Sequence, residues 1–300
     1  MKNENTLRNI IRQRTAPFAI EPADFPARPD PIPGIRAVLF DVYGTLVSSA
    51  SGDIGAARLE AFADAAREAL EALGLPTRPS RAATLADRLV ELIQREHARL
   101  NAQGFPCPEV DIREIWTEAL DDSTTQRPSL SPPDIERLAT EFECRTNPVW
   151  PMPGARETLE RLHRAGIALG IVSNAQFYTP LTLETLFDCR LAELGFDQEL
   201  CSWSYRQRVA KPDITLFAAP LIVLAERGIS PEQILYIGND MLNDITPSHQ
   251  SGCRTTLFAG DRRSLRLRPD HPEASRIRPD AVITHWNQLS QVLPDLPEAP

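Results

Sequence analysis

An apolar run ends in an aspartate near the beginning of the chain, where residues 38–46 read VLFDVYGTL. Residues 35–40 are short and mostly apolar, which is the pattern of a buried parallel strand. Asp41 follows directly, and a turn at Gly44 and Thr45 presents backbone N–H groups that an anion can contact. Asp41 is therefore a candidate catalytic carboxylate and Thr45 a candidate substrate contact, although an aspartate here can also simply cap a turn.

Four further apolar runs follow in the second half of the chain. We expect strands over residues 167–172, 234–237, 255–258 and 281–283. Helices are expected over residues 154–165 and 213–227. Strands that alternate with helices form a parallel sheet covered by helices on both faces, so we predict an α/β fold. In such sheets, ligands bind beyond the carboxyl ends of the strands.

Residues 51–145 have a different hydrophobic pattern, with almost no strand-like run. Residues 53–73 place apolar side chains at helical spacing, and further helices are expected over residues 85–100, 111–120 and 133–142. This block predicts an all-helical domain inserted into the α/β core, which comprises residues 35–50 and 146–300.

Residues 1–34 form an appendage that is rich in proline. A short helix is expected over residues 7–14, and five prolines lie between residues 22 and 33. Proline removes backbone donors and fixes φ, so we expect an extended arm that is not part of a sheet.

The composition argues against several classes of protein. A formal net charge of −9 and a pI of about 5.2 disfavour nucleic-acid binding, which needs clustered Lys and Arg. We interpret the basic segments at residues 262–263 and 266–268 as a solvated loop. Five scattered cysteines favour reduced thiols. No run approaches the ~20 apolar residues of a membrane span, and residues 1–14 are polar, so we expect a soluble, cytoplasmic protein without membrane contact.

Two short motifs supply polar side chains after the first strand. Ser173 and Asn174 follow the second strand and offer a hydroxyl and an amide to phosphate or carboxylate oxygens. Lys211 precedes a helix and offers a positive charge. Each motif is weak alone, because Ser-Asn also begins ordinary loops and a lone lysine is usually solvated.

The motif after the third strand carries two carboxylates, and residues 238–244 read GNDMLND. Asp240 and Asp244 lie four residues apart on a strand-to-helix turn, where they either face one point or cap the helix. Together with Asp41 they would share one cleft, and like charges raise each other's pKa. A cation relieves this repulsion, and oxygen-only ligands suit Mg²⁺.

The four motifs, in this order and at strand ends, resemble those of the haloacid dehalogenase superfamily. The resemblance spans residues 35–283, and the helical insert lies where that family carries its first-type cap. It implies a Rossmann-like core and a covalent intermediate on Asp41. It also implies phosphate or carboxylate contacts from Ser173 and Asn174, and charge neutralisation by Lys211.

The resemblance further implies a metal site in this chain. In metal-dependent members of the family, Mg²⁺ would be bound by the carboxylates of Asp41 and Asp240 and by the backbone carbonyl of Tyr43. Asp244 would support this site.

Tyr43 departs from the phosphatase pattern of that family. Phosphatases there usually carry a second aspartate at this position, which protonates the leaving alcohol. Losing a general acid typically costs about 10²- to 10⁴-fold, and a phenol of pKa about 10 is a poor replacement. A tyrosine here is similar to the metal-free L-2-haloacid dehalogenases, whose leaving group is a halide.

The fourth motif favours the opposite interpretation, because Asp240 matches the metal-binding form. A buried carboxylate without a metal is costly, whereas a tyrosine in place of an acid only lowers the rate. We therefore favour a Mg²⁺-dependent hydrolase with Asp41, Tyr43 and Lys211 as catalytic residues and a small phosphorylated molecule as substrate. The alternatives are a metal-free 2-haloacid dehalogenase and a catalytically slow member that binds a ligand.

Overall fold

Six parallel strands form the central sheet of the computed structural model, which describes residues 2–50, 57–121 and 130–296. In spatial order the strands are β5 (Phe196–Trp203), β4 (Ala168–Ser173), β1 (Ala37–Phe40), β6 (Ile234–Gly238), β7 (Arg254–Phe258) and β8 (Ala281–Ile283). β1 lies at the centre, with Ala37 in register with Ala168 of β4 and Ile234 of β6. All side chains of β1 and β6 are buried, as in a sheet that is covered on both faces.

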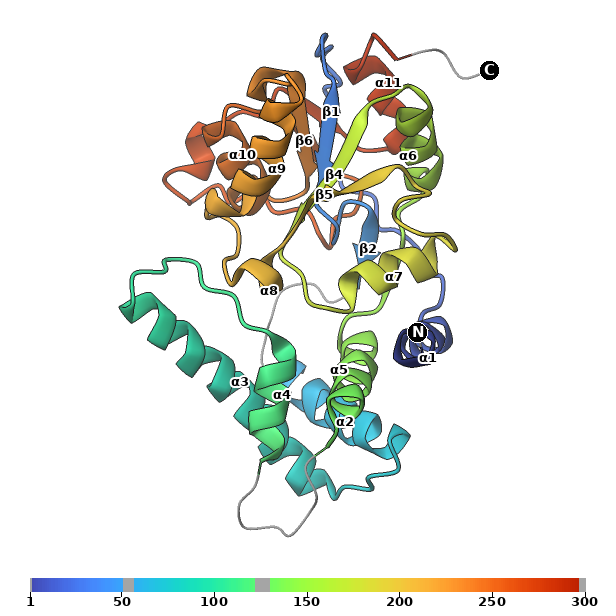
Figure 1. Ribbon diagram of the computed structural model, residues 1–300, viewed down its shortest axis with the longest axis vertical. Helices are drawn as coiled ribbons and strands as arrows, with labels where there is room; N and C mark the ends of the chain where they lie inside the picture. The colour runs from blue at the N-terminus through green and yellow to red at the C-terminus, as the bar shows by residue number, and fades with distance from the viewer. Residues whose placement is uncertain (1, 51–56, 122–129, 297–300) are drawn as a thin grey trace.

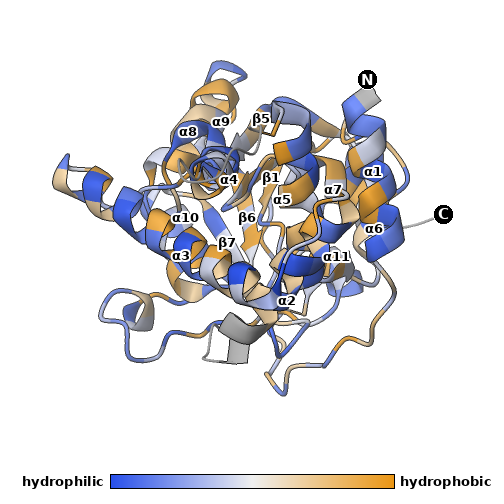
Figure 2. Ribbon diagram, turned by 90° about the horizontal axis from the view of Figure 1, so that it is seen from below, coloured by the Kyte–Doolittle hydropathy of each residue, from blue (hydrophilic) through white to orange (hydrophobic). Residues whose placement is uncertain are grey.

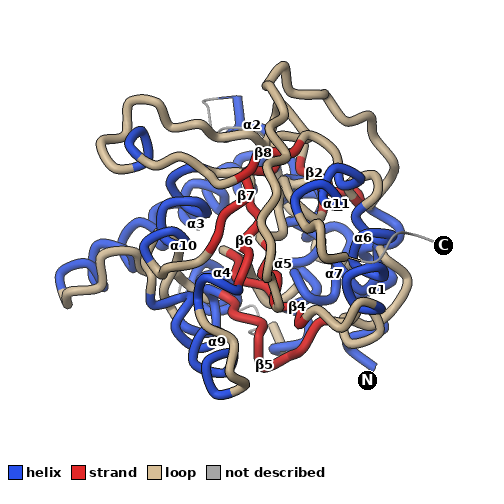
Figure 3. The backbone as a smooth tube through the Cα atoms, turned by 90° about the horizontal axis from the view of Figure 1, so that it is seen from above, coloured by secondary structure: helices blue, strands red, loops and turns tan. Residues whose placement is uncertain are grey.

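Helices cover the two faces of this sheet (Figures 1 and 3). On one face lie α9 (Thr215–Glu226) and α10 (Thr246–Gln250); on the other lie α6 (Ala155–Arg164), α7 (Thr179–Leu186) and α11 (Leu289–Val292). Seen from below, the helices alternate between polar and apolar residues along their length, as helices with one buried face do (Figure 2). The predicted α/β fold with a parallel sheet is confirmed, and the expected strands and helices of the core lie close to their expected bounds.

Several core elements were not expected from the sequence, among them β5, α7 and α8 (Ser204–Gln207). β5 has the sequence FDQELCSW, which carries polar residues in its middle because the strand is at the sheet edge and partly exposed. Its pattern therefore lacks the continuous apolar run of a buried strand.

A lobe of helices lies beyond the carboxyl edge of the sheet (Figure 1). Its described helices are α2 (Ala57–Ala72), α3 (Pro79–Ala102), α4 (Ile112–Leu120) and α5 (Pro132–Thr146). Trp116 is fully buried in this lobe, with its ring 5.2 Å from that of Phe142. The chain enters the lobe through β2 (Val47–Ser49) and returns through β3 (Val149–Pro151), and these two strands pair antiparallel. The four expected helices are present, although residues 53–56 of the first lie outside the described residues.

The N-terminal helix joins the lobe to the core. α1 (Lys2–Arg14) is longer than the expected helix over residues 7–14, and it packs beside α5 and α7 (Figure 1). Leu7 and Ile11 are almost completely buried. Arg8 forms an ion pair with Glu184 of α7, and Arg14 Nε lies 3.0 Å from the Glu141 carboxylate of α5.

Residues 15–36 run extended along the core. Arg28 exchanges two 2.8 Å backbone hydrogen bonds with Val282 of β8, and Ile32 N–H donates to the Val292 carbonyl at 2.7 Å. None of the six strands of the sheet comes from this arm, in agreement with the expectation, although Arg28 forms one isolated antiparallel bridge to β8. Arg28 can do so because it has the backbone N–H that a proline lacks.

The lobe also contacts the core through residues 107–110, which run beside residues 208–210. Pro108 and Val209 form an antiparallel bridge, and the Ala210 N–H donates to the Cys107 carbonyl at 2.8 Å. Within the described ranges, no helix is both long and apolar enough to cross a lipid bilayer.

Candidate active site

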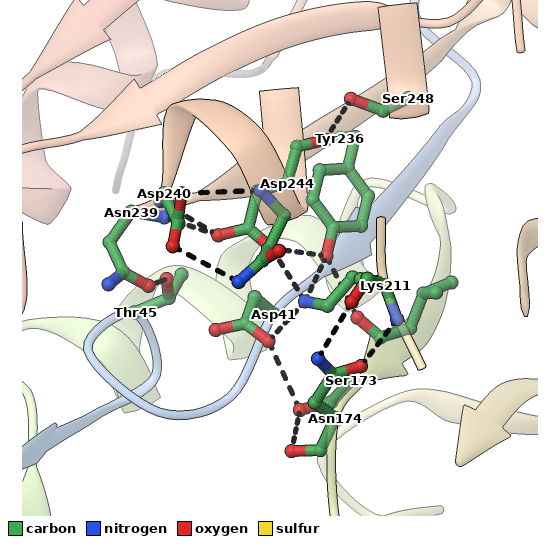
Figure 4. Close-up of polar contacts among 12 residues, drawn as sticks. Asp41, Thr45, Ser173, Asn174, Lys211, Tyr236, Asn239, Asp240, Asp244 and Ser248 are labelled. Carbon is green, nitrogen blue, oxygen red and sulfur yellow. Dashed lines mark hydrogen bonds and ion pairs between the residues drawn. The ribbon is translucent and has the colours of Figure 1, made fainter. Parts of the chain in front are cut away.

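Polar side chains from three neighbouring strands meet at the carboxyl edge of the sheet (Figure 4). Asp41 follows β1, Ser173 ends β4, and Asp240 follows β6. Lys211 reaches the same place from the loop before α9. Because β1 lies between β4 and β6, the fold brings the four sequence motifs together.

Lys211 is the centre of a buried charged cluster. Its ammonium Nζ donates to Oδ1 of Asp41 at 2.7 Å and to Oδ1 of Asp244 at 2.5 Å. The Lys211 side chain is only 2% exposed. Burial alone would lower the pKa of Lys211, but the carboxylates of Asp244 and Asp41 outweigh it and raise this pKa. Lys211 therefore carries a stable positive charge beside Asp41.

Asp244 anchors this lysine to the fourth motif. Its Oδ2 accepts the backbone N–H groups of Asn239 and Asp240, both at 2.9 Å. Burial raises the pKa of the Asp244 carboxyl to about 7, against the opposing effect of Lys211. A side chain at Gly238 would lie 2.4 Å from Cγ of Asp244, so the glycine permits this close approach.

Ser173 and Asn174 act on different partners. The hydroxyl of Ser173 donates to Oδ1 of Asp41 at 3.1 Å. The amide of Asn174 accepts the Lys211 N–H at 2.7 Å and donates to the Lys211 carbonyl at 3.3 Å. In this structure Asn174 thus holds the backbone of Lys211.

Thr45 joins the first motif to the fourth. Its fully buried hydroxyl donates to Oδ1 of Asn239 at 3.0 Å, and Nδ2 of Asn239 donates to the Ser264 carbonyl at 2.6 Å. Gly44 has a φ of 86°, and an added Cβ there would lie 2.6 Å from Nδ2 of Asn239. Asn239 therefore fixes the turn that follows Asp41.

Tyr43 lies at the junction of the core and the helical lobe. Its hydroxyl lies 2.9 Å from Oγ1 of Thr179, the first residue of α7. Burial raises the pKa of the Tyr43 hydroxyl far above its ordinary value, and Glu143 of α5 adds to this effect. The phenol is therefore neutral and hydrogen-bonded at neutral pH.

Asp240 pairs with Arg268. Nη2 of Arg268 lies 2.7 Å from Oδ2 of Asp240, and Nε lies 3.2 Å from Oδ1. The interpretation of residues 266–268 as a solvated loop is therefore wrong for Arg268, although Leu267 is indeed exposed. The prediction failed because Arg268 pairs with a carboxylate that is distant in the sequence, and the local sequence does not reveal this partner.

A family model described as haloacid dehalogenase-like hydrolase matches residues 35–252, well over half of the chain. The protein belongs to this family. The match confirms the resemblance inferred from the four motifs and makes the chain a hydrolase.

Individual relatives agree with this assignment. A phosphoglycolate phosphatase of Salmonella paratyphi A is 27% identical and covers 86% of this chain and 92% of its own length. A 2-haloacid dehalogenase of Pseudomonas syringae pv. Tomato DC3000 has a similar structure, with a TM-score of 0.52, 21% identity, and coverage of 86% of this chain and 97% of that one. A haloacid dehalogenase-type phosphatase of Thermococcus onnurineus has a TM-score of 0.50, 18% identity and coverage of 86% and 97%. The two structures establish a shared fold.

Phosphatases of this family are generally metal-dependent. Carboxylate oxygens, the ligands that divalent cations such as Mg²⁺ prefer, are present at this site. Three carboxylates, of Asp41, Asp240 and Asp244, face two cationic side chains, Lys211 and Arg268. No hydrogen-bond donor among the described residues reaches Oδ2 of Asp41. Those residues nevertheless contain no ready-made group of three acidic, histidine or cysteine ligands. Asp244 instead binds Lys211, and Asp240 binds Arg268.

Three site residues escaped the sequence reasoning: Tyr236, Asn239 and Arg268. Tyr236 is fully buried, accepts a 3.0 Å hydrogen bond from Lys211 Nζ, and donates to the Val172 carbonyl at 2.8 Å. A hydroxyl in an otherwise aliphatic strand is a signal that points to it. Asn239 adjoins Asp240 in the fourth motif, whereas Arg268 carries no local signal.

Proposed function

We propose that this hydrolase cleaves the phosphate esters of small metabolites, with Asp41 as the nucleophile and Mg²⁺ as a cofactor. The orientation of Asp41 carries the proposal. Its Oδ1 accepts hydrogen bonds from Lys211 and Ser173, while Oδ2 has no donor among the described residues. A carboxylate held by one oxygen presents the other to an electrophile.

The reaction would proceed in two displacements at phosphorus. Oδ2 of Asp41 attacks the phosphorus, a new O–P bond forms, and the bond to the leaving oxygen breaks with its electron pair. Water then attacks the phosphorus of the aspartyl-phosphate, and the bond between Oδ2 and phosphorus breaks with its electron pair, which releases phosphate and restores the carboxylate. The proton that the water loses goes to solvent, and the departed oxygen takes up a proton from solvent. Lys211 remains protonated throughout and offsets the negative charge that gathers beside Asp41.

The chain's carboxylates would hold the cation. Asp41, Asp240 and the backbone carbonyl of Tyr43 are the proposed ligands, and Asp244 supports the site through Lys211. Bound there, Mg²⁺ would neutralise the phosphoryl oxygens.

We assign specificity to the helical lobe, residues 51–145, acting as a cap over the carboxyl edge of the sheet. Closure of such a cap excludes water from the reaction. Thr45, Ser173 and Asn174 are the proposed contacts to the substrate anion; Ser173 lies beside Asp41, whereas Thr45 and Asn174 would first have to leave Asn239 and the Lys211 backbone. The phosphoglycolate phosphatase relative supports a short phosphorylated carboxylic acid as the substrate class.

A second candidate function, 2-haloacid dehalogenation, is favoured by Tyr43 and by the Asp240–Arg268 pair. With its pKa raised by burial, the Tyr43 hydroxyl is a very weak general acid, and a halide needs no proton when it leaves. Asp41 would then attack the carbon that bears the halogen, and water would hydrolyse the resulting ester.

Phosphate release should be assayed with 2-phosphoglycolate and related phosphate esters, with and without Mg²⁺, beside halide release from 2-chloropropionate. We expect Mg²⁺-dependent phosphate release that is abolished in Asp41→Asn. Halide release that persists in EDTA, without phosphate release, would overturn the proposal in favour of the dehalogenase.

A further inference from the structure

Arg268 reaches Asp240 from a loop that the backbone ties firmly to the fourth motif. The Arg266 N–H donates to the Asn239 carbonyl at 3.0 Å, and the Met241 N–H donates to the Arg266 carbonyl at 2.8 Å. This bridge fixes the chain two residues before Arg268, whose own φ of 49° lies in the left-handed region. The guanidinium is therefore delivered to Asp240 by a constrained backbone.

The contact occupies both oxygens of the Asp240 carboxylate. Arg268 donates to Oδ1 from Nε at 3.2 Å and to Oδ2 from Nη2 at 2.7 Å. This is the two-pronged geometry in which an arginine binds a carboxylate most strongly. The Asp240 side chain is 9% exposed and that of Arg268 is 37% exposed, so the arginine side of the pair borders solvent.

Local donors use the remaining acceptor capacity of Asp240. Oδ1 accepts the N–H groups of Leu242 at 2.8 Å and Asn243 at 3.2 Å, and Oδ2 accepts Nδ2 of Asn243 at 3.2 Å. A carboxylate offers about four lone-pair sites. A cation can therefore reach Asp240 only if one of these donors leaves, and Arg268 is the one that carries a positive charge and borders solvent.

We propose that Arg268 is a tethered counter-ion that competes with the divalent cation for Asp240. The proposal rests on the assignment of Asp240 as a metal ligand in the proposed function. This pairing explains why Asp240, although it belongs to a metal-binding type of motif, is not left as an unpaired carboxylate when no cation is bound. The site therefore exchanges one positive charge for another when the cation binds, and the affinity for the cation is reduced by the strength of the ion pair.

Direct cation binding tests this competition without any substrate. Mn²⁺ binding is measured by electron paramagnetic resonance for the wild type, Arg268→Gln, Arg268→Lys and Arg262→Gln. Arg262 serves as the matched control, because it lies in the same loop but pairs with Glu21 and is 73% exposed. We expect Arg268→Gln to bind Mn²⁺ about tenfold more tightly, as loss of one charge-assisted contact predicts. Arg268→Lys should fall between, and Arg262→Gln should match the wild type.

Thermal unfolding gives a second readout. Arg268→Gln should be less stable than the wild type in EDTA, and added Mg²⁺ should raise its melting temperature more than that of the wild type. Equal or weaker Mn²⁺ binding by Arg268→Gln overturns the competition, as does an Asp240→Asn variant that binds as tightly as the wild type. Neither result bears on hydrolysis at Asp41, which the phosphate-release assay tests separately.

Discussion

The hydroxyl of Tyr43 lies 2.9 Å from Oγ1 of Thr179, at the position where phosphatases of this family usually carry a second aspartate. The phenol is neutral, because burial and the nearby Glu143 raise its pKa. In the proposed reaction, the leaving group would meet a hydroxyl that donates or accepts a hydrogen bond but is a very weak acid at neutral pH. Substrate choice should depend on how readily the leaving group departs unprotonated.

Replacing Tyr43 by aspartate should therefore speed the cleavage of alkyl phosphates. A positioned general acid typically raises the rate by about 10²- to 10⁴-fold. Because the aspartate side chain is shorter than that of Tyr43, we expect it to recover only part of this, a rate increase of about tenfold or more. Rates should be compared for aryl and alkyl phosphates in wild type, Tyr43→Asp and Tyr43→Phe. The rate should increase only in Tyr43→Asp, and only for alkyl phosphates, whose leaving groups are poor. Equal gains for aryl and alkyl esters would contradict the role assigned here.

Removal of the Lys211 charge should cost both activity and stability. Lys211→Met leaves two buried carboxylates without their shared cation, a change that typically costs about 3–5 kcal/mol. We expect the rate of phosphate release to fall by about 10³-fold, as on loss of a positioned electrostatic donor.

The stability loss in Lys211→Met should depend on pH. Lys211 lowers the pKa of Asp244, so its removal raises this pKa further above the unfolded value. A raised carboxyl pKa contributes stability at low pH that is lost as the pH rises through the folded value, so the variant should be closest to the wild type near about pH 5 and weakest near about pH 8. Urea unfolding at both values measures this. The double variant Lys211→Met/Asp244→Asn should lose less stability between these two pH values than Lys211→Met does. An equal pH dependence in the two variants would exclude Asp244 as its source.

Substitution of Gly44 separates backbone strain from steric contact. An alanine at a positive φ costs about 1–2 kcal/mol, and at Gly44 the added Cβ also meets Nδ2 of Asn239 at 2.6 Å. Gly104 is the matched control, because its φ is 93° and the described residues leave the space around its Cβ open. We expect Gly44→Ala to be less stable than Gly104→Ala by about 1–3 kcal/mol, since overpacking adds to the strain.

Only Gly44→Ala should also lower activity, because Asn239 links the nucleophile turn to the fourth motif. Chemical denaturation and the phosphate-release assay measure the two effects. Similar losses of stability and activity in both variants would show that the contact with Asn239 is unimportant.

Glu109 should make the contact between lobe and core sensitive to pH. Its carboxylate accepts the Ser204 hydroxyl at 2.8 Å, and burial raises its pKa above 4.5. A raised pKa favours folding below the unfolded pKa, and this contribution is lost as the pH rises through the folded value. In Glu109→Gln, the free energy of unfolding relative to the wild type should therefore rise between about pH 4 and about pH 7. Glu114→Gln, at an exposed carboxylate of the same lobe, is the matched control for the substitution.

The sequence predicted the parallel sheet and the helical insert because buried strands and amphipathic helices leave local, periodic patterns. β1 and β6 are continuous apolar runs, and each is followed by polar residues of the candidate site. The two strands could therefore be predicted together with Asp41, which follows β1, and Asp240, which follows β6. β5 was not, since an edge strand with a half-exposed middle lacks that pattern.

The candidate site was predictable to the extent that its residues follow strands. Lys211 lies in a loop, and only its place between two other motifs distinguished it from a surface lysine. Its actual partners are Tyr236 in β6, Asp41 directly after β1 and Asp244 in the helical turn after β6, and sequence patterns do not show that these segments are adjacent. Arg268 was missed for the same reason: its contact with Asp240 depends on how a long loop folds back.

The central place of β1 also has a consequence for the order in which the protein can fold. β1 leaves the ribosome well before its two neighbours, which begin only at Ala168 and Ile234. β1 must therefore wait without its sheet partners until β4 and β6 have been synthesised, whereas the helices of residues 57–146 make many of their contacts locally. During translation the helical lobe can form first, and Asp41 acquires its surroundings late, when β6 inserts beside β1.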